Sequence, residues 1–329
     1  MRVAINGLGR IGRAVCKILL SNDKFEIVAL NDIVDAETIA YLMKYDSVYG
    51  RFERDIIPNE GQLDIQGKRF PLYKEKDLSA LPWQEHHVDM VFECTGVFNK
   101  RKDLMKHKEA GAKQVILSAP AKDDEIPTVV FGVNEPDSDD NIISCASCTT
   151  NCIAPVVEIM DRHFGIKKAT LTTVHAFTST QGIVDSPNEK IRRGRAASEN
   201  FVPTTTGATK ATTKVITQLE NKFEGSAIRG PVPSGSISDM NFVIEKRASK
   251  EEINDAFKKE AKSERYKGIL GVTSEPLVSS DIIKDPRASI VDLGMTMSID
   301  GDLIKVMSWY DNEWGYAMQM VRTAEYLCQ

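Results

Sequence analysis

The sequence lacks the features that mark membrane and secreted proteins. It has no run of about 18 consecutive apolar residues, so we expect no membrane-spanning helix. The N-terminus reads MRVAINGLGRIG and has no basic segment followed by an apolar core and a small-residue cleavage site, so no signal peptide is visible. We therefore expect a cytoplasmic protein whose six cysteines are reduced thiols.

The sequence also lacks an excess of positive charge. Its formal net charge is −5, and no stripe of interleaved basic and aromatic residues is present. Both observations disfavour a non-catalytic binding role, such as RNA binding, as the main function. The chain has no internal repeat and no low-complexity linker, and its 329 residues predict two domains at about 150 residues per domain.

The first half begins with a pattern typical of dinucleotide binding. The apolar run RVAING leads into Gly7, Gly9 and Gly12 in GxGxxG spacing, and RIGRAVCKILL follows with helical periodicity. These glycines allow a sharp turn and bring main-chain N–H groups close to a pyrophosphate at a helix N-terminus. The same pattern also occurs in tight turns that bind nothing.

Asp32 strengthens the dinucleotide interpretation. It ends the next predicted strand, EIVALND, twenty residues after Gly12. In a dinucleotide fold a carboxylate at this place binds the adenosine ribose hydroxyls. Because a carboxylate repels a 2′-phosphate, NAD is favoured over NADP.

Alternating strand and helix patterns continue to about residue 147. The segments VDMVFECTG, KQVILSAP and TVVFGVN read as strands, and KDLMKHKEAGA reads as a surface helix. This alternation predicts an α/β fold with a doubly wound, mostly parallel Rossmann-type sheet. QLDIQGKRFPLYK interrupts the rhythm as a hairpin, and Thr95, Gly96 and Ser118 fall at the carboxyl ends of strands, where ligands bind.

The second half predicts an α+β domain. NCIAPVVEIMDRHFG reads as a long helix, and SKEEINDAFKKEAK as an amphipathic helix capped by Ser249. Several later segments alternate apolar and polar residues, as in a half-exposed antiparallel sheet. These segments are KATLTTVHAF, GSAIRGPVP, SISDMNFVIEK, ASIVDLGMTMSI and DLIKVMSWYD, and EWGYAMQMVRTAEYL is a final helix.

Three cysteines lie within eight residues, in CASCTTNC. A zinc site is disfavoured because Cys145 and Cys148 form one CxxC and no second pair exists, so no metal is expected. A redox disulfide between the same two residues stays open. The third interpretation makes Cys148 a nucleophile, because the start of a helix favours the thiolate, and treats Cys152 as a small buried residue.

A nucleophilic thiol needs a base, and His175 is the best candidate of five histidines. It ends the apolar strand TLTTVH, where it could also be an ordinary core residue. A thiolate and an imidazole in a chain that also has a dinucleotide-binding domain predict one class of reaction. The thiolate adds to an aldehyde, the hemithioacetal loses hydride to a nicotinamide, and an acceptor resolves the thioester.

Five separate motifs, in order along the chain, resemble phosphorylating glyceraldehyde-3-phosphate dehydrogenases. The motifs are INGLGRIGR, SCTTNC, TTVHAFTSTQ, TTTGATKA and WYDNEWGY. The resemblance implies Cys148 as nucleophile and His175 as base. For NAD, it implies contacts from Arg10, Ile11, Asp32, Lys76, Ser118 and Asn312. For inorganic phosphate it implies Ser147, Thr149, Thr206 and Gly207, and for the substrate phosphate Thr178, Arg195 and Arg229.

The segment KIRRGR agrees with a phosphate site, because four cations in six residues of an acidic chain suit phosphate oxygens. It could instead be a solvated charged loop. The family resemblance further implies that this loop reaches the cofactor of a neighbouring subunit in a homotetramer. It also implies an NAD-binding domain over 1–147, a catalytic domain over 148–311, and a helix over 312–329 that folds back on the first domain.

The chain departs from the family pattern at two places. Cys145 replaces the usual Asn, and we hypothesise that it traps oxidised Cys148 as a disulfide, with a Cys148–Cys152 crosslink as the alternative. Gly230 replaces the usual Val, and the run from Ser234 to Ser236 is also unusual. We expect Gly230 to loosen the strand that carries Arg229 and to alter phosphate affinity or acceptor preference.

The predicted activity is oxidation of glyceraldehyde 3-phosphate with phosphate and NAD to 1,3-bisphosphoglycerate and NADH, a step of glycolysis and gluconeogenesis. Erythrose-4-phosphate dehydrogenase, a related enzyme that hydrolyses its thioester, is the alternative. Thr178 and Thr206 favour the phosphorylating enzyme, because they keep the hydroxyls of both anion sites.

Overall fold

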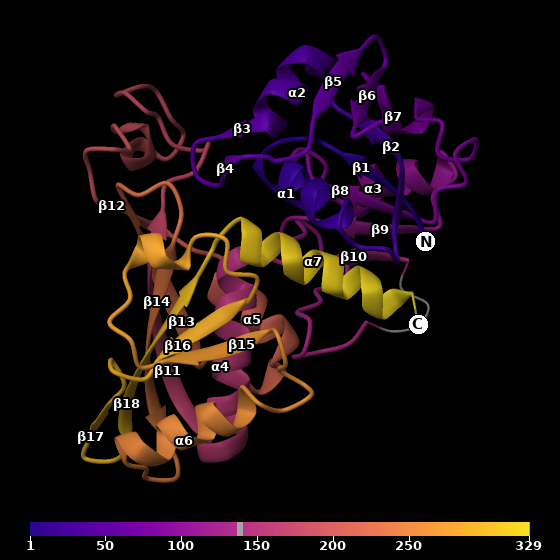
Figure 1. Ribbon diagram of the computed structural model, residues 1–329. Helices are drawn as coiled ribbons and strands as arrows, with labels where there is room; N and C mark the ends of the chain where they lie inside the picture. Colours follow the sequence, from indigo (N-terminus) through magenta and orange to yellow (C-terminus); the bar gives the residue numbers. More distant parts are fainter. Residues whose placement is uncertain (137–140, 329) are drawn as a thin grey trace. The chain divides into compact units, whose positions relative to one another are not determined.

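The computed structural model describes residues 1–136 and 141–328. The described residues fall into two compact units, which Figure 1 shows as ribbons. The first unit comprises those within 1–129, 136–146 and 320–329, and the second comprises 130–135 and 147–319. Within the described ranges, no helix is both long and apolar enough to cross a membrane.

The first unit contains an eight-stranded sheet in the order β10-β9-β8-β1-β2-β7-β6-β5. The strands from β10 to β7 run parallel, in the order typical of dinucleotide-binding folds, and β6 and β5 add an antiparallel edge. The doubly wound sheet and the hairpin β6–β7 are therefore as predicted. The strand bounds are β1 Arg2–Asn6, β2 Glu26–Asn31, β5 Ile56–Asn59, β6 Gln62–Ile65, β7 Lys68–Tyr73, β8 Met90–Glu93, β9 Gln114–Leu117 and β10 Ile142–Ser144.

Short helices connect these strands. The helical bounds are α1 Arg10–Leu19, α2 Ala36–Lys44, α3 Arg101–Glu109 and the 3₁₀ turn η1 Leu78–Ala80, and a small ladder pairs β3 Tyr45–Asp46 with β4 Gly50–Arg51. The central strands are almost wholly apolar and buried, because helices cover both faces of a parallel sheet.

The predicted strand over 128–134 is wrong. Thr128 makes only an isolated bridge to Ser144, and the chain then turns. Gly132 adopts a left-handed conformation with φ of +81°, and the Asn134 side chain accepts the Val130 N–H at 2.8 Å. Turn chemistry therefore overrides the apolar pattern, and β10 completes the sheet in place of this segment.

The second unit contains a mostly antiparallel sheet in the order β12-β13-β11-β14-β18-β16-β15, with β17 paired to β18. Only the β11–β13 and β15–β16 pairs are parallel. The predicted α+β class is confirmed, and the segment ASIVDLGMTMSI forms two strands instead of one. The bounds are β11 Ile166–Ala176, β12 Val202–Thr205, β13 Phe223–Gly230, β14 Ser236–Ile244, β15 Leu270–Thr273, β16 Ser289–Asp292, β17 Met297–Ile299 and β18 Leu303–Tyr310.

The helices of this unit cover one face of its sheet. α4 is almost entirely buried over its first three turns, and its Ile153, Val157 and Met160 share a core with Leu171 of β11 and Phe242 of β14. Ser249 and Glu252 form the predicted capping box at the start of α6. The bounds are α4 Cys148–Phe164, α5 Ala208–Val215 and α6 Lys250–Glu260, with the 3₁₀ turns η2 Ile191–Gly194, η3 Thr217–Leu219 and η4 Ser279–Ile282. α7, Trp314–Leu327, begins in this unit and ends in the first.

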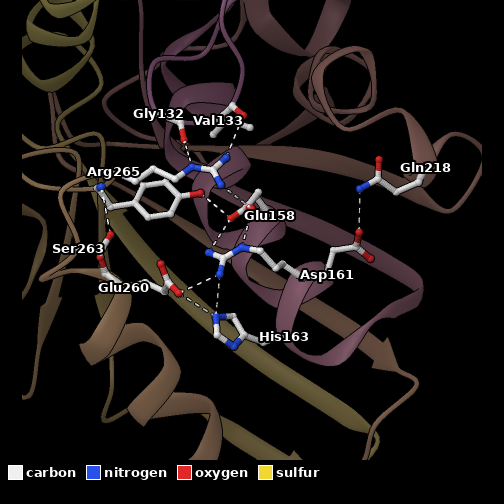
Figure 2. Close-up of polar contacts among 11 residues, drawn as sticks. Gly132, Val133, Glu158, Asp161, His163, Gln218, Glu260, Ser263 and Arg265 are labelled. Carbon is white, nitrogen blue, oxygen red and sulfur yellow. Dashed lines mark hydrogen bonds and ion pairs between the residues drawn. The ribbon is translucent and has the colours of Figure 1, made fainter.

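A charged network secures α4 from its outer side, as Figure 2 shows. Glu158 accepts hydrogen bonds from Arg162 (2.8 Å), Arg265 (3.1 Å) and the Tyr266 hydroxyl (2.6 Å). Arg162 also donates to Glu260 of α6 at 3.0 Å, and Arg265 donates to the main-chain carbonyls of residues 132 and 133. This network joins α4, α6 and the 130–135 segment within one unit.

Candidate active site

The glycine-rich turn between β1 and α1 has the backbone that its sequence predicts. Gly7 has φ of +89°, and a Cβ on Gly12 would lie 1.8 Å from the Gly7 carbonyl oxygen. Neither position admits a side chain. Gly9 differs, because no atom lies within 4 Å of where its Cβ would be. The open space over Gly9 is therefore available for close approach of a ligand to the main chain.

A cavity of about 510 Å³ lies beside this turn, a size suited to a small-molecule or cofactor site. Of the predicted cofactor residues, Gly7, Gly9, Asp32 and Lys76 line it. Asp32 accepts hydrogen bonds from the Leu8 N–H at 2.5 Å and from the Val34 N–H at 3.0 Å. Asp32 thus ties the end of β2 to the glycine-rich turn.

The remaining predicted cofactor residues lie elsewhere in their units. The Arg10 guanidinium pairs with Asp46 at 2.7 Å, and Gly12 and Ile11 follow in α1. Ser118 follows β9, and its N–H donates to the Glu93 carbonyl at 3.0 Å. Asn312 belongs to the second unit. The sequence interpretation missed several other residues of the cavity wall: Asn6, Arg13, Asn31, Glu75 and Phe98.

Cys148 and His175 meet in the second unit. Cys148 is the first residue of α4, and Sγ lies 3.3 Å from Nε2 of His175 near the end of β11. In the tautomer that carries its proton on Nδ1, the ring donates to the main-chain carbonyl of Ala176 at 2.7 Å and presents the Nε2 lone pair to the sulfur. Nε2 is therefore the atom that can take the thiol proton.

Arg229 lies directly behind this pair. Its Nη1 donates to the Ala176 carbonyl at 3.0 Å and lies 2.5 Å from Nδ1 of His175. Burial, together with the Arg229 charge, lowers the pKa of His175 to about 3. Burial raises the pKa of the Cys148 thiol, and the Arg229 charge and hydrogen bonds from Thr149 offset only part of this rise.

These shifts correct one expectation from the sequence. The helix start was expected to hold Cys148 as a thiolate, but burial outweighs the favourable contributions at this position. Burial disfavours the charged form of each member of the pair. Nε2 of His175 lies within reach of the thiol proton that leaves Sγ as the sulfur attacks.

Tyr310 supports both members of the pair and was missed from the sequence. Its buried hydroxyl bonds the Thr149 hydroxyl at 2.8 Å and the Thr173 hydroxyl at 2.9 Å. Its ring meets the His175 ring edge-on, with centroids 5.9 Å apart. Tyr310 therefore holds α4 and β11 together beside the pair, through hydrogen bonds and ring packing.

The predicted phosphate ligands occupy helix starts and a loop. Ser147 caps α4 by accepting the Thr150 N–H at 3.2 Å, and the Thr206 hydroxyl accepts the Ala208 N–H at 3.1 Å at the start of α5. Gly207 precedes α5 with open space around it. The Thr178 hydroxyl lies 2.8 Å from that of Thr180 in the loop after β11.

The basic segment contributes a different arginine from the predicted one. Arg195 is largely exposed and pairs with Asp185 at 2.8 Å. Arg193 is less exposed, donates to the Thr204 hydroxyl at 3.0 Å, and lowers the pKa of both His175 and Arg229 through its charge. Arg193 is therefore the arginine of this segment whose charge acts on His175 and Arg229.

Two buried nitrogen donors of the second unit lack a protein acceptor in the described part of the chain. They are Nε of Arg229 and Nε2 of Gln181, whose Oε1 accepts the Thr178 N–H at 3.3 Å. Buried N–H donors normally find a partner, so an anion bound here would satisfy them. The donor set of this unit therefore fits a phosphate group.

Comparisons with known proteins identify the family of both units. Residues 1–101 match the family model for the glyceraldehyde 3-phosphate dehydrogenase NAD binding domain, and residues 147–312 match the model for its C-terminal domain. The chain belongs to the glyceraldehyde-3-phosphate dehydrogenase family.

Similar proteins of this family match over nearly their whole length. Glyceraldehyde-3-phosphate dehydrogenase of Geobacillus stearothermophilus is 47% identical over 330 residues, covering 99% of this chain and 98% of that protein. Glyceraldehyde-3-phosphate dehydrogenase 2 of Streptomyces avermitilis is 46% identical over 325 residues, with coverage of 98% and 96%. The family, fold class, NAD cofactor and phosphorylating dehydrogenase activity predicted from the sequence are confirmed, and the erythrose-4-phosphate alternative is not favoured.

Cys145, which replaces the usual Asn of the family pattern, belongs to the first unit. Cys145 is buried, and burial raises the pKa of its thiol to about 12, while a hydrogen bond with Thr323 partly opposes the rise. A resolving thiol needs access and thiolate character, so the structure gives no support to Cys145 as a trap for oxidised Cys148. Cys152 is fully buried, as expected of a small core residue. Over residues 1–136 and 141–328, no group of three metal-binding side chains occurs.

The second departure has an ordered structure. Gly230 continues the β13 ladder opposite Ala176, and a Cβ there would lie 3.7 Å from the Phe201 ring, an ordinary contact. Gly230 thus keeps its place in the pairing of β13 with β11. Gly235 has φ of +85°, and a Cβ there would lie 2.0 Å from the Ser279 carbonyl oxygen, so this turn requires glycine.

Proposed function

We infer that Cys148 carries the covalent chemistry of an NAD-dependent, phosphorylating oxidation of glyceraldehyde 3-phosphate. The observation that carries this inference is the 3.3 Å contact between Sγ of Cys148 and Nε2 of His175. His175 accepts the thiol proton as sulfur adds to the aldehyde carbon. NAD, when bound, supplies the hydride acceptor. The thioester left on Cys148 is resolved by an oxygen of inorganic phosphate, which yields 1,3-bisphosphoglycerate.

We propose that the first unit holds NAD. The open space over Gly9 and the Asp32 carboxylate beside it fit a pyrophosphate and a ribose. The proposed cofactor contacts are Gly7, Gly9, Arg10, Ile11, Gly12, Asp32, Lys76 and Ser118, with Asn312 holding the carboxamide. The corresponding domains are 1–147 for NAD, 148–311 for catalysis and 312–329 for the returning helix, of which residues 137–140 and 329 lie outside the described part.

We propose that the two phosphate groups bind around Arg229. Ser147, Thr149, Thr206 and Gly207 serve the attacking phosphate, and Thr178 and Arg229 serve the substrate phosphate. Arg193 takes the part first assigned to Arg195, because Arg193 is the cation that acts on His175 and Arg229. The unpartnered donors of Arg229 and Gln181 support an anion at this place.

We propose a homotetramer located in the cytoplasm. The segment that carries the basic loop exposes large apolar side chains, with Ile183 79%, Ile191 85% and Phe201 71% accessible. Exposed apolar groups on one segment favour burial against another copy of the chain. Free thiols at all six cysteines fit a reducing compartment.

The test is NADH formation from glyceraldehyde 3-phosphate, with phosphate and cofactor each varied. We expect steady turnover with NAD only when inorganic phosphate is present. Turnover that does not depend on phosphate would instead indicate a thioester resolved by water.

A further inference from the structure

Two buried serines in the unusual run before β14 hold the amide of Asn312. Ser236 donates a hydrogen bond to Oδ1 of Asn312 at 2.9 Å and accepts the Ala176 N–H at 3.0 Å. Ser234 lies 3.5 Å from the same Oδ1 and donates to Oδ1 of Asp311 at 3.1 Å. Both serines are at most 1% exposed.

The Ser236 hydroxyl fixes which way the amide points. Its oxygen is already occupied by the Ala176 N–H, and its proton needs an acceptor because no water reaches it. The acceptor is Oδ1 of Asn312, so a rotated amide would leave this hydroxyl without one. The amide oxygen therefore faces inward and its NH₂ group faces away from the serines.

The outward NH₂ group has no protein acceptor in residues 1–136 and 141–328. Asn312 is 5% exposed, and its Oδ1 bonds inward to the serines. An NH₂ group only donates, so a partner at this position must offer an acceptor oxygen or nitrogen. A carbonyl oxygen satisfies that requirement, whereas an amine does not.

The surrounding frame keeps this amide in place. The neighbouring Asp311 carboxylate accepts the N–H groups of Glu313 and Trp314, both at 2.9 Å, and that of Lys284 at 2.6 Å. Gly235 is packed against the Ser279 carbonyl, so the turn between the two serines cannot shift freely. Hydrogen bonds and close packing around the Asn312 amide thus fix the position at which it contacts a ligand.

We propose that Ser236, assisted by Ser234, is a positioning residue that turns the Asn312 NH₂ group toward the carbonyl oxygen of the cofactor carboxamide. This proposal rests on the cofactor contact proposed for Asn312. The same Ser236 hydroxyl binds the N–H that follows His175, so it links the cofactor contact to the strand of the catalytic base.

The test compares NAD with 3-acetylpyridine adenine dinucleotide, which keeps the carbonyl oxygen but has a methyl group in place of the amine. In Ser236→Ala the Asn312 amide can rotate. NAD can then pair with either the oxygen or the NH₂ group of the Asn312 side chain, because its own carboxamide both donates and accepts. The analogue has only a carbonyl acceptor, so it can pair only with the NH₂ group. We expect kcat/KM to fall about fivefold with NAD, the loss of about one hydrogen bond, and distinctly further with the analogue.

Ser238→Ala is the matched control. Ser238 lies two residues along β14 and is equally buried, but its hydroxyl makes no hydrogen bond to Asn312 or Ala176. We expect this control to keep the wild-type ratio of kcat/KM for the two cofactors. Should Ser236→Ala not fold, Ser236→Cys keeps the size but weakens the donor, and the ratio should shift in the same direction.

Equal losses with both cofactors in the Ser236 variants, or no loss, would overturn the proposal, because a merely structural role does not discriminate between carboxamide groups. Equilibrium binding of both cofactors to the wild-type and variant proteins is measured alongside. If the wild-type protein binds both cofactors but forms no reduced product, the proposed function fails, while the ratio of binding constants still tests the serines.

Discussion

Arg229 shows how a single residue sets the state of the catalytic pair. Its guanidinium lies against His175 and shares the Ala176 carbonyl with it, so a second positive charge on the imidazole is disfavoured. The same charge favours the thiolate of Cys148, but burial is the larger effect there. Burial thus opposes a charge on both members of the pair, and an anion bound at Arg229 would change that balance.

Arg193 and Arg195 provide a prediction at this scale. Arg193→Leu should raise the KM for phosphate or for the phosphorylated substrate by about tenfold or more, because it removes a charge-assisted donor near the pair. Arg195→Leu should change either KM by less than about twofold, because exposed pairs contribute little. Initial rates at varied phosphate and substrate concentrations measure both, and a larger effect at Arg195 would contradict the assignment.

At the residue scale, the sequence predicted the reactive groups better than their surroundings. Cys148, His175 and Arg229 meet as expected because each stands at the end or start of a recognisable element. Tyr310 was missed because a buried tyrosine at a strand end looks like an ordinary core residue. Arg193 was missed because the sequence shows several neighbouring arginines alike. Which of their side chains is less exposed depends on the path of the backbone, and no sequence pattern encodes that path.

Two glycines at the departures from the family pattern differ in the space around them. Gly230→Ala should keep or raise stability by up to about 1 kcal/mol, because the site has room and alanine restricts the unfolded chain. Gly235→Ala should destabilise by about 2 kcal/mol or more, because it combines a positive φ with a close approach to the Ser279 carbonyl. Urea unfolding at one protein concentration compares them, and equal effects would contradict this account of the turn.

Helix α4 carries Cys148 at its start and the Glu158 network about three turns later. Burial opposes the charge of Glu158, but hydrogen bonds from Arg162 and Tyr266 and the Arg265 charge outweigh it and lower its pKa. The hydrogen bond from Arg162 is the largest of the effects that lower the pKa of Glu260. Because both folded pKa values lie below the unfolded value of about 4.3, the network stabilises the fold above that pH.

This network predicts a specific acid sensitivity. Glu158→Gln should lower the free energy of unfolding by about 1–3 kcal/mol at pH 7, and the difference from wild type should shrink as pH falls through the folded pKa. Asp255→Asn, which breaks an exposed pair with Lys258, should cost less than about 0.5 kcal/mol. A Glu158→Gln deficit that stays constant between pH 7 and pH 3 would contradict the role of its charge.

Element types followed from the sequence wherever local signals agreed. The parallel strands are continuous apolar runs, and α6 has a capping box, so both were predictable. The segment at 128–134 misled because its apolar run resembles a strand, while Gly132 and Asn134 form a turn. Strand order in the second sheet could not be predicted, because the pairing of β11 with β13 and β14 joins segments more than 50 residues apart.

At the scale of the whole molecule, the two units carry different functional groups. The cavity beside the glycine-rich turn lies in one unit, and the thiol, imidazole and guanidinium lie in the other. The fold class and family were predictable because motifs of both units occur in order along the chain. The charge state of the pair was not, since it depends on burial that only the folded structure defines.

The central claim is that the acyl group is carried by Cys148. The direct measurement mixes the protein with NAD and glyceraldehyde 3-phosphate without inorganic phosphate, quenches in acid and maps adducts by mass spectrometry. We predict a rapid burst of NADH and a 3-phosphoglyceroyl thioester on the peptide that contains Cys148, both absent in Cys148→Ser. An adduct on another residue, or a burst that survives in Cys148→Ser, would contradict the account.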